Sequence, residues 1–106
     1  MLWKKLQKHY SQYPKDFYLP VFLDNHDTNR FLFECGGNSE KLKRGMAALR
    51  QTGQPVVIYY GTEIQMSHDT SVDQGTAYSE EAARGRMVWN HDDAKLREYI
   101  RHLFLE

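Results

Sequence analysis

An unbroken run of polar residues, from Asp24 to Arg30, holds the side chains of this sequence that are best suited to chemistry. A carboxylate can stabilise developing positive charge, accept hydrogen bonds from substrate hydroxyls or bind a metal ion, and an adjacent imidazole can donate to a substrate oxygen. Polar residues that follow a strand also commonly form or cap the next turn. From residue types and spacing, His26 and Asp27 are therefore candidate functional residues, and turn formation is the alternative.

Adjacent His and Asp residues occur at three places in the chain: His26-Asp27, His68-Asp69 and His91-Asp92. Such pairs raise the alternative of a metal-dependent phosphohydrolase, in which His and Asp side chains converge on divalent ions. Those enzymes hold the pair mostly on helices, whereas the first pair here follows an apolar run and the other two lie in polar loop sequence. The spacing matches no ligand set that a known metal site requires, so we expect no metal site in this chain.

Two apolar runs predict the elements that position the polar run. Residues 17–23 read Phe-Tyr-Leu-Pro-Val-Phe-Leu, and residues 56–60 read Val-Val-Ile-Tyr-Tyr. Short, nearly continuous apolar runs are typical of strands in parallel sheets, which are buried on both faces. Because proline cannot donate to a ladder, we expect pairing of the first run to begin at or after Pro20.

The sequence between these runs predicts a helix. Asn38 or Ser39 offers an N-cap, and Gly53 stands where a residue in the left-handed conformation would end the helix. Apolar residues recur between them with helical spacing, at Leu42, Met46 and Leu49. The order strand, helix, strand predicts a βαβ unit with a right-handed crossover.

The flanking segments predict two further helices and a long loop. Residues 2–12 form the first predicted helix, ended by Pro14, and residues 94–104 form the second. The second has a candidate buried face of Leu96, Ile100, Leu103 and Phe104. Residues 61–90 are rich in Gly, Ser, Thr and Asp and read as loop. We expect Trp3 and Trp89 to belong to the core rather than to form stacking platforms for a ligand.

The fold class that these elements predict is α/β. Two parallel strands leave open apolar edges, so the chain is expected to be part of a larger α/β body or to self-associate. In such folds ligands bind at the carboxyl ends of the strands, and in a (β/α)8 barrel the active site lies on that rim. Asp24 to Arg30 follow the first predicted strand directly and are therefore expected on the rim.

Three segments resemble signatures of the α-amylase family of glycoside hydrolases. Residues 22–27, Phe-Leu-Asp-Asn-His-Asp, resemble the family's fourth signature region, which ends in a His-Asp pair after the seventh barrel strand. Residues 59–66, Tyr-Tyr-Gly-Thr-Glu-Ile-Gln-Met, resemble the segment after the family's eighth strand, and the chain as a whole is similar to the neopullulanase and cyclomaltodextrinase type. Residues 84–89, Arg-Gly-Arg-Met-Val-Trp, resemble a later Arg-x-Pro-Met-x-Trp piece. Their order and approximate spacing agree with the family.

The resemblance implies a role for each matching residue. Asp27 would be the family's third acidic residue, which binds hydroxyls of the distorted sugar at the cleavage point and stabilises the transition state. His26 would contact the same sugar. Arg30 lies outside the matching segment but near the pair in sequence, so we expect it to contact substrate or to pair with a carboxylate. Asp24 matches no catalytic position, so we expect a structural residue that caps a turn.

Other matching residues are expected to be structural. Tyr60, Gly61 and Glu63 would close the barrel and shape its rim. Thr62 and Gln65 replace the family's usual Asp and Gly. These departures leave the substrate preference open.

The resemblance also implies the architecture: a partial TIM barrel, in which a βαβ unit matches strands 7 and 8 with flanking helices. Residues 1–106 would be a fragment of the catalytic (β/α)8 barrel, with no complete second domain. The parent protein would be a retaining glycosidase acting on α-glucan or maltodextrin-type substrates. Its nucleophile and acid/base would lie about 5 Å apart. The family places both after the fourth and fifth strands, and neither signature occurs here, so we expect this chain to be inactive alone.

No cofactor is expected in this fragment, and calcium is possible in the parent. A non-catalytic carbohydrate-binding or scaffold module from an inactive barrel is the alternative function. Such a half-site would bind sugar weakly, on the order of millimolar. The predicted open strand edges favour self-association of the isolated fragment.

Charge and hydropathy restrict the other partners. Lys plus Arg (14) equals Asp plus Glu (14), and this balance argues against nucleic acid, which usually needs a basic stripe. No apolar run approaches the roughly 20 residues of a membrane-spanning helix, so no membrane partner is expected. Cys35 is the single cysteine, so no intrachain disulfide forms. The compartment of the parent stays open.

Overall fold

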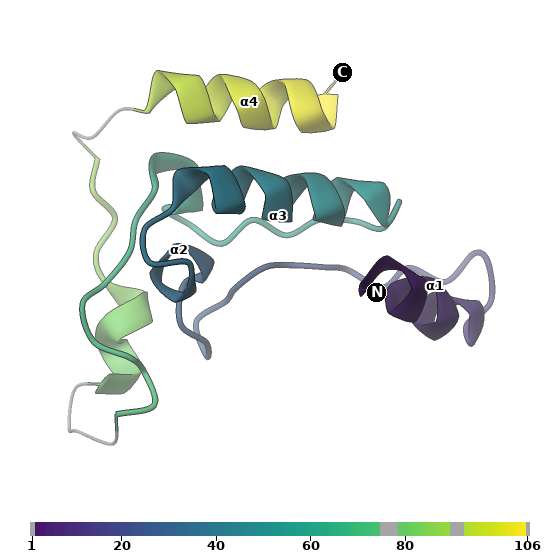
Figure 1. The fold of residues 1–106 in the computed structure, drawn as a ribbon, viewed down its shortest axis with the longest axis horizontal. Helices are drawn as coiled ribbons and strands as arrows, with labels where there is room; N and C mark the ends of the chain where they lie inside the picture. Colours follow the sequence, from purple (N-terminus) through teal and green to yellow (C-terminus); the bar gives the residue numbers. More distant parts are fainter. Residues whose placement is uncertain (1, 75–78, 90–92, 106) are drawn as a thin grey trace.

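The computed structural model describes residues 2–74, 79–89 and 93–105, and Figure 1 shows their arrangement. In chain order the helical elements are α1 (Leu2–Ser11), α2 (Phe31–Glu34), α3 (Ser39–Gln51), the 3₁₀ turns η1 (Thr62–Ile64) and η2 (Ser79–Arg84), and α4 (Ala94–Leu105). The three predicted helices are confirmed as α1, α3 and α4. None of the described helices combines the length and the apolar character that crossing a membrane requires.

Helix α3 begins and ends as its sequence predicts. The Asn38 side chain accepts hydrogen bonds from the backbone N–H groups of Glu40 and Lys41, which the first turn of a helix leaves without partners. At the other end, Gly53 takes a φ of +71°. A residue with a side chain is strained in this left-handed conformation, so glycine suits the exit from the helix.

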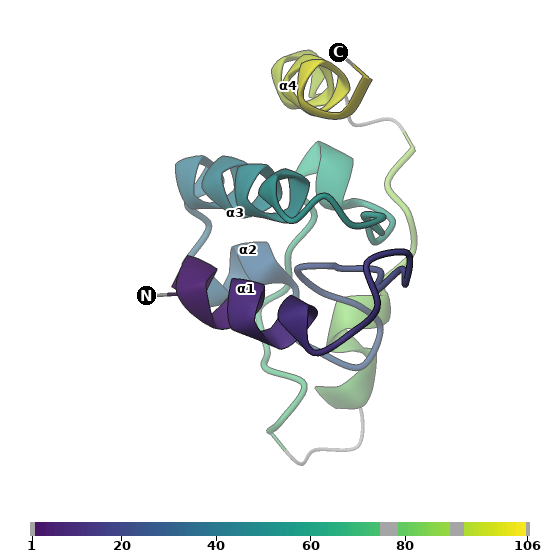
Figure 2. The same cartoon turned by 90° about the vertical axis from the view of Figure 1, so that its right-hand side faces the viewer.

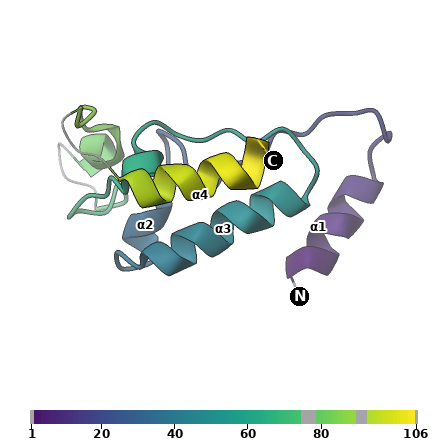
Figure 3. The same cartoon turned by 90° about the horizontal axis from the view of Figure 1, so that it is seen from above.

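The core lies between α3 and α4, which run side by side in Figures 1 and 3. Figure 2 shows α4 as a separate layer over α3. The buried side chains of this cluster are Leu32, Leu42, Met46 and Leu96. Partly buried residues pack against it, namely Leu23, Phe31, Ile100, Leu103 and Phe104. The predicted apolar face of residues 94–104 is therefore confirmed as the face that α4 turns toward α3.

The two segments that were predicted to be strands lie side by side in extended conformation, but neither forms a β-strand. One parallel bridge joins Val21 to Val56. The Val21 N–H donates to the Pro55 carbonyl at 2.9 Å, and the Val57 N–H donates to the Val21 carbonyl at 2.9 Å. No β-strand forms within the described ranges. The parallel pairing is thus present, in the predicted order, as a single bridge.

Local chemistry explains why this ladder is short. On the N-terminal side of the bridge the next ladder bond would run from the backbone nitrogen of residue 55 to the Leu19 carbonyl, and Pro55 has no N–H to donate. The backbone N–H of Leu19 donates instead to the side-chain carbonyl of Gln54, at 2.9 Å. Parallel sheets are normally covered on both faces and continued at both edges, and this pair has no further strand beside it among the described residues.

One face of the extended pair is open to solvent. The register that joins Val21 to Val56 places Phe22 beside Val57, and these side chains are 47% and 53% exposed. Leu23, on the opposite face, packs against the core cluster. Gly45 of α3 allows this approach, because a Cβ there would lie 3.1 Å from the Leu23 side chain.

The predictions for the tryptophans and for the loop of residues 61–90 have different outcomes. Trp89 is 85% exposed, so its prediction as a core residue is wrong. It ends an apolar triplet of which Val88 lines a cavity with Ile64 and Met66, whereas Trp89 itself extends into solvent. The Trp3 side chain and the pair His91-Asp92 lie outside the described part of the structure. The predicted loop of residues 61–90 contains the short turns η1 and η2.

Candidate functional site

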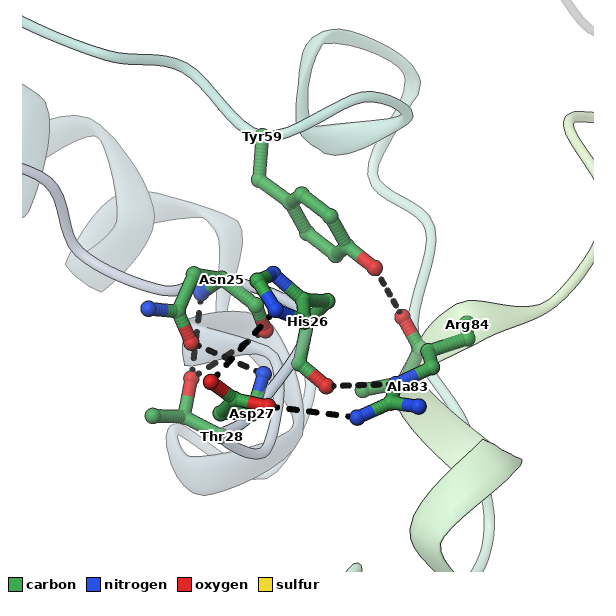
Figure 4. A network of polar contacts seen from close by, with 7 residues as sticks. All are labelled: Asn25, His26, Asp27, Thr28, Tyr59, Ala83 and Arg84. Atoms are coloured by element: carbon green, nitrogen blue, oxygen red, sulfur yellow. Dashed lines mark hydrogen bonds and ion pairs between the residues drawn. The ribbon is translucent and has the colours of Figure 1, made fainter.

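A tight turn at the end of the first extended segment presents His26 and Asp27 (Figure 4). The Asn25 side-chain oxygen accepts the Asp27 N–H at 2.9 Å, and the Thr28 hydroxyl oxygen accepts the Asn25 N–H at 3.1 Å. The Thr28 N–H donates to the Asn25 carbonyl at 3.3 Å, which closes the turn. Asn25 and Thr28 therefore form the turn, and the two residues between them are free to face solvent.

The candidate pair is exposed and in mutual contact. The side chains of His26 and Asp27 are 63% and 67% exposed, and His26 Nε2 lies 3.4 Å from Asp27 Oδ2. The structure thus brings an imidazole and a carboxylate together on the surface beyond the extended segment. Both are accessible to a ligand.

Arg84 approaches this pair from a distant part of the chain. Its Nε donates to the His26 carbonyl at 2.8 Å, and its Nη2 lies 3.2 Å from Asp27 Oδ1 (Figure 4). Asp27 is therefore contacted on one oxygen by Arg84 and on the other by His26. The sequence placed Arg84 in the third family-like segment but gave no sign of this contact, because the partners are 57 residues apart.

Two tyrosines of the second extended segment hold the backbone around Arg84. The Tyr59 hydroxyl donates to the Ala83 carbonyl at 2.8 Å, and the Tyr60 hydroxyl donates to the Gly85 carbonyl. Burial raises the pKa of the Tyr59 hydroxyl, and the neighbouring Tyr60 raises it further, so the phenol remains a donor at neutral pH. The tyrosines thus link the second extended segment to Arg84.

Arg30 lies beneath these tyrosines rather than at the surface. Its side chain is 1% exposed, and its Nη1 donates to the Tyr60 carbonyl at 2.8 Å. The guanidinium carbon lies 4.6 Å from the centroid of the Tyr59 ring and 4.9 Å from that of Tyr60, within cation–π range. Its Nη2 has no hydrogen-bond partner within the described residues. In the described structure the Arg30 guanidinium is therefore buried and not accessible to a ligand.

Asp24 has the structural role expected of it. It is 4% exposed, and its Oδ2 accepts the Phe31 N–H at 2.8 Å, at the start of α2. Burial raises the pKa of the Asp24 carboxyl, while the Phe31 N–H and the Arg30 charge lower it in part. Asp24 thus anchors the first turn of α2 and lies away from the exposed pair.

A polar cavity of about 360 Å³ surrounds the exposed pair and is lined by His26, Asp27, Val72, Asp73 and Arg84. Sequence reasoning missed Val72 and Asp73, because they come from a loop with no recognisable motif. A cavity of about 450 Å³ between the C-terminal parts of α3 and α4 is larger but contains none of the candidate residues. The chemistry of the side chains therefore favours the smaller cavity.

The other described His-Asp pair has no site of its own. His68 Nε2 accepts the Arg30 N–H at 3.0 Å, and its Nδ1 lies 2.9 Å from the Thr70 carbonyl. Both ring nitrogens are therefore engaged with backbone groups. Across the described part of the chain, no three His, Cys, Asp or Glu side chains gather closely enough to hold a metal ion.

Comparison with known proteins agrees with the resemblance of the three segments. A sequence model of the alpha-amylase catalytic domain matches residues 1–101. The chain is 40% identical over 74 residues to neopullulanase 2 of Thermoactinomyces vulgaris. This match covers 67% of this chain and 11% of that protein. It is 35% identical over 96 residues to a cyclomaltodextrinase of Geobacillus thermopakistaniensis, covering 86% of this chain and 15% of that protein. The chain thus spans only a small part of these relatives.

A solved structure shows the same arrangement of the backbone. The cyclic alpha-maltosyl-(1→6)-maltose hydrolase of Arthrobacter globiformis, in its ligand-free form, matches 94% of this chain with a TM-score of 0.75 and 28% identity. The match covers 22% of that chain. With the catalytic-domain model matching residues 1–101, these findings show that the chain belongs to the alpha-amylase family and that its fold is part of a barrel.

Proposed function

We propose that this chain is part of a retaining α-glycosidase that acts on α-glucan or maltodextrin-type substrates. The single observation that supports this best is the exposed contact of His26 with Asp27, at 3.4 Å, in a polar cavity that Arg84 also lines. The relatives neopullulanase 2 and cyclomaltodextrinase are named as enzymes of this substrate class. The whole protein would break α-glucosidic bonds.

Asp27 is proposed as the carboxylate that stabilises the transition state. The transition state of glycoside hydrolysis resembles an oxocarbenium ion, so a fixed negative charge near the ring lowers its energy. The contacts of Arg84 and His26 with the two Asp27 oxygens, at 3.2 and 3.4 Å, would orient the carboxylate before substrate arrives. His26 is proposed to contact a hydroxyl of the same sugar.

Arg30 is proposed to serve this site through its neighbours. Its burial and its hydrogen bond to the Tyr60 carbonyl support a positioning role, in which it holds the tyrosines that in turn hold the backbone of Arg84. The direct contact with substrate that is expected from its place in the sequence would require the guanidinium to leave this pocket.

The finer architecture is part of the same proposal. The bridged segments around Val21 and Val56 would be strands 7 and 8 of the (β/α)8 barrel, with α3 as the helix between them and α1 and α4 as the flanking helices. The parallel direction of the bridge supports this order. Additional strands on both sides would extend the pairing that the isolated chain limits to one bridge.

The 106 residues are proposed to be inactive by themselves. Retaining hydrolysis needs a nucleophile and an acid/base, and removing such groups costs several orders of magnitude in rate. The test is a sensitive maltooligosaccharide cleavage assay on the purified chain. We expect no turnover above the Asp27→Asn variant. Turnover that this substitution abolishes would refute the proposed inactivity and support the enzyme class.

Sugar binding without turnover is the second expected property. The exposed pair in its cavity supports binding on the order of millimolar, because most walls of a complete cleft are missing. A maltotriose titration followed by NMR measures it. Binding by a whole parent protein that shows no hydrolysis would favour the alternative, a non-catalytic carbohydrate-binding module.

Self-association of the isolated chain is also proposed, through a second copy. The half-exposed side chains of Phe22 and Val57 on one face of the extended pair support it. Light scattering coupled to size exclusion should show a dimer that weakens on Val57→Lys. A monomer at all concentrations would contradict this proposal and leave the proposed glycosidase assignment unaffected.

A further inference from the structure

The side chain of Asn29 attaches the loop that follows η1 to the segment just after the turn formed by Asn25 and Thr28. Its Oδ1 accepts the Val72 N–H at 2.8 Å, and its Nδ2 donates to the Ser71 hydroxyl at 3.1 Å. The same Nδ2 lies 2.6 Å from Glu34 Oε1, which fixes the orientation of the amide. The Asn29 side chain thus joins parts of the chain that are far apart, since Val72 and Ser71 are 43 and 42 residues away in sequence.

His68 attaches the same loop a second time. Its ring stacks on Phe33 with centroids 4.3 Å apart and an interplanar angle of 15°. Since Nε2 accepts the Arg30 N–H, the other nitrogen carries the proton and donates to the Thr70 carbonyl. The loop from His68 to Val72 is therefore fixed to residues 29–33 through hydrogen bonds and a ring stack.

These attachments accompany a placement of Val72 and Asp73 in the lining of the same cavities as Asp27. Both residues line the 360 Å³ cavity that contains His26 and Arg84. Both also line an adjoining cavity of about 330 Å³, which again includes Asp27. The loop thus contributes Val72 and Asp73 to the lining of two cavities, and Asp27 lines both of them. Asp73 itself is exposed, so its carboxylate is accessible from the solvent.

We propose that Asp73 is a substrate-contacting residue of this site, held against it by Asn29 and His68. The inference rests on the proposed function. A carboxylate accepts hydrogen bonds from two neighbouring hydroxyls of a glucose unit, and Val72 beside it offers an apolar surface for the carbon face of the ring. Asp27 would stabilise charge at the reacting sugar, while Asp73 binds hydroxyls of the glucan and influences which glucan fits.

The test is a maltotriose titration of the full chain, followed by the backbone amide signals in NMR. Asp73→Asn and Asp73→Ala should weaken binding on the order of tenfold, because each removes a charged acceptor from a hydroxyl. Asp69→Asn is the matched control: it makes the same charge change in the same loop at an exposed residue outside both cavities. It should bind like the unaltered chain.

Asn29→Ala tests the attachment. It should shift the Val72 amide signal and weaken maltotriose binding about as much as Asp73→Asn, on the order of tenfold. A cooperative unfolding transition checks that each variant is folded.

The outcomes separate the two claims. If Asp27→Asn abolishes binding while both Asp73 variants bind normally, the role of Asp73 is refuted and the proposed function stands. If the unaltered chain shows no saturable shift with maltotriose, the sugar site in this chain is refuted and the role of Asp73 with it. Equal weakening by Asp69→Asn and Asp73→Asn would also refute the inference, because general charge would then explain the effect.

Discussion

The Arg84 guanidinium lies 3.2 Å from the Asp27 carboxylate, although the two residues are 57 positions apart in the chain. It also donates a hydrogen bond to the His26 carbonyl. Arg84 therefore fixes both the backbone and the side chain of the candidate site. The two side chains are 44% and 67% exposed, so solvent screens their attraction. The contact orients Asp27 more than it stabilises the fold.

Substitution of Arg84 should separate orientation from stability. Arg84→Ala is expected to lower the free energy of unfolding by less than about 1 kcal/mol, as for other exposed ion pairs. It should nevertheless shift the amide signals of His26 and Asp27. Arg86→Ala is the control, since Arg86 is also exposed and has the same charge. A loss above about 2 kcal/mol for Arg84→Ala in urea unfolding would show that the contact is mainly structural.

The buried carboxyl of Asp24 predicts a pH dependence. Burial raises its pKa in the folded chain. An acid with a raised folded pKa binds more protons when folded, so its contribution to stability is greatest below its ordinary pKa and falls as the pH rises through the folded value. Asp24→Asn removes this titration and keeps an acceptor for the Phe31 N–H. It should match or exceed the unaltered chain in stability at pH 7 and lose that advantage in acid.

Asp24→Ala provides the comparison for this prediction. It removes the acceptor and leaves the Phe31 N–H without its partner, which should cost about 1–2 kcal/mol in urea unfolding at pH 7. A marked destabilisation by Asp24→Asn at pH 7 would instead show that the negative charge, through Arg30, is the stabilising feature.

Among the glycines that the structure describes, Gly61 is predicted to be the least tolerant of a side chain. Its φ is +85°, and a Cβ there would overlap the Met66 side chain. Gly61→Ala should cost about 2–4 kcal/mol, from the left-handed backbone and the clash together. Gly53→Ala is the control: its φ is +71° with no atom within 4 Å of the added Cβ, so only about 1 kcal/mol is expected. Equal costs in urea unfolding would contradict the role of Met66.

Arg30 substitutions should distinguish positioning from direct substrate contact. Arg30→Ala is expected to cost about 3 kcal/mol, because it removes a buried hydrogen bond and the packing on Tyr59 and Tyr60. Arg30→Met keeps much of the volume and removes a buried charge, so it should cost less. If Arg30→Met were fully stable and abolished maltotriose binding without shifting the amide signals of His26, Asp27 and Arg84, positioning would not explain the loss and direct contact of the guanidinium with the sugar would.

Much of the helical structure could be predicted from the sequence. The spacing of Leu42 and Met46, the Asn38 cap and the Gly53 exit are local features, and local hydrogen bonding and side-chain periodicity determine them. The strand prediction was only partly informative. The apolar runs lie parallel as expected, but ladder formation depends on neighbouring strands and on a backbone donor that Pro55 does not provide.

For the candidate site, the sequence by itself determined the pair His26-Asp27 and the turn that presents it, because adjacent residues need only local geometry. It also determined the family, through motifs that are contiguous. Only the tertiary structure decided that Arg84 contacts Asp27, that Arg30 is buried under two tyrosines, and that Asp73 faces the same cavity. These relationships join residues dozens of positions apart, and such distances close only when the packed elements fix where each loop lies.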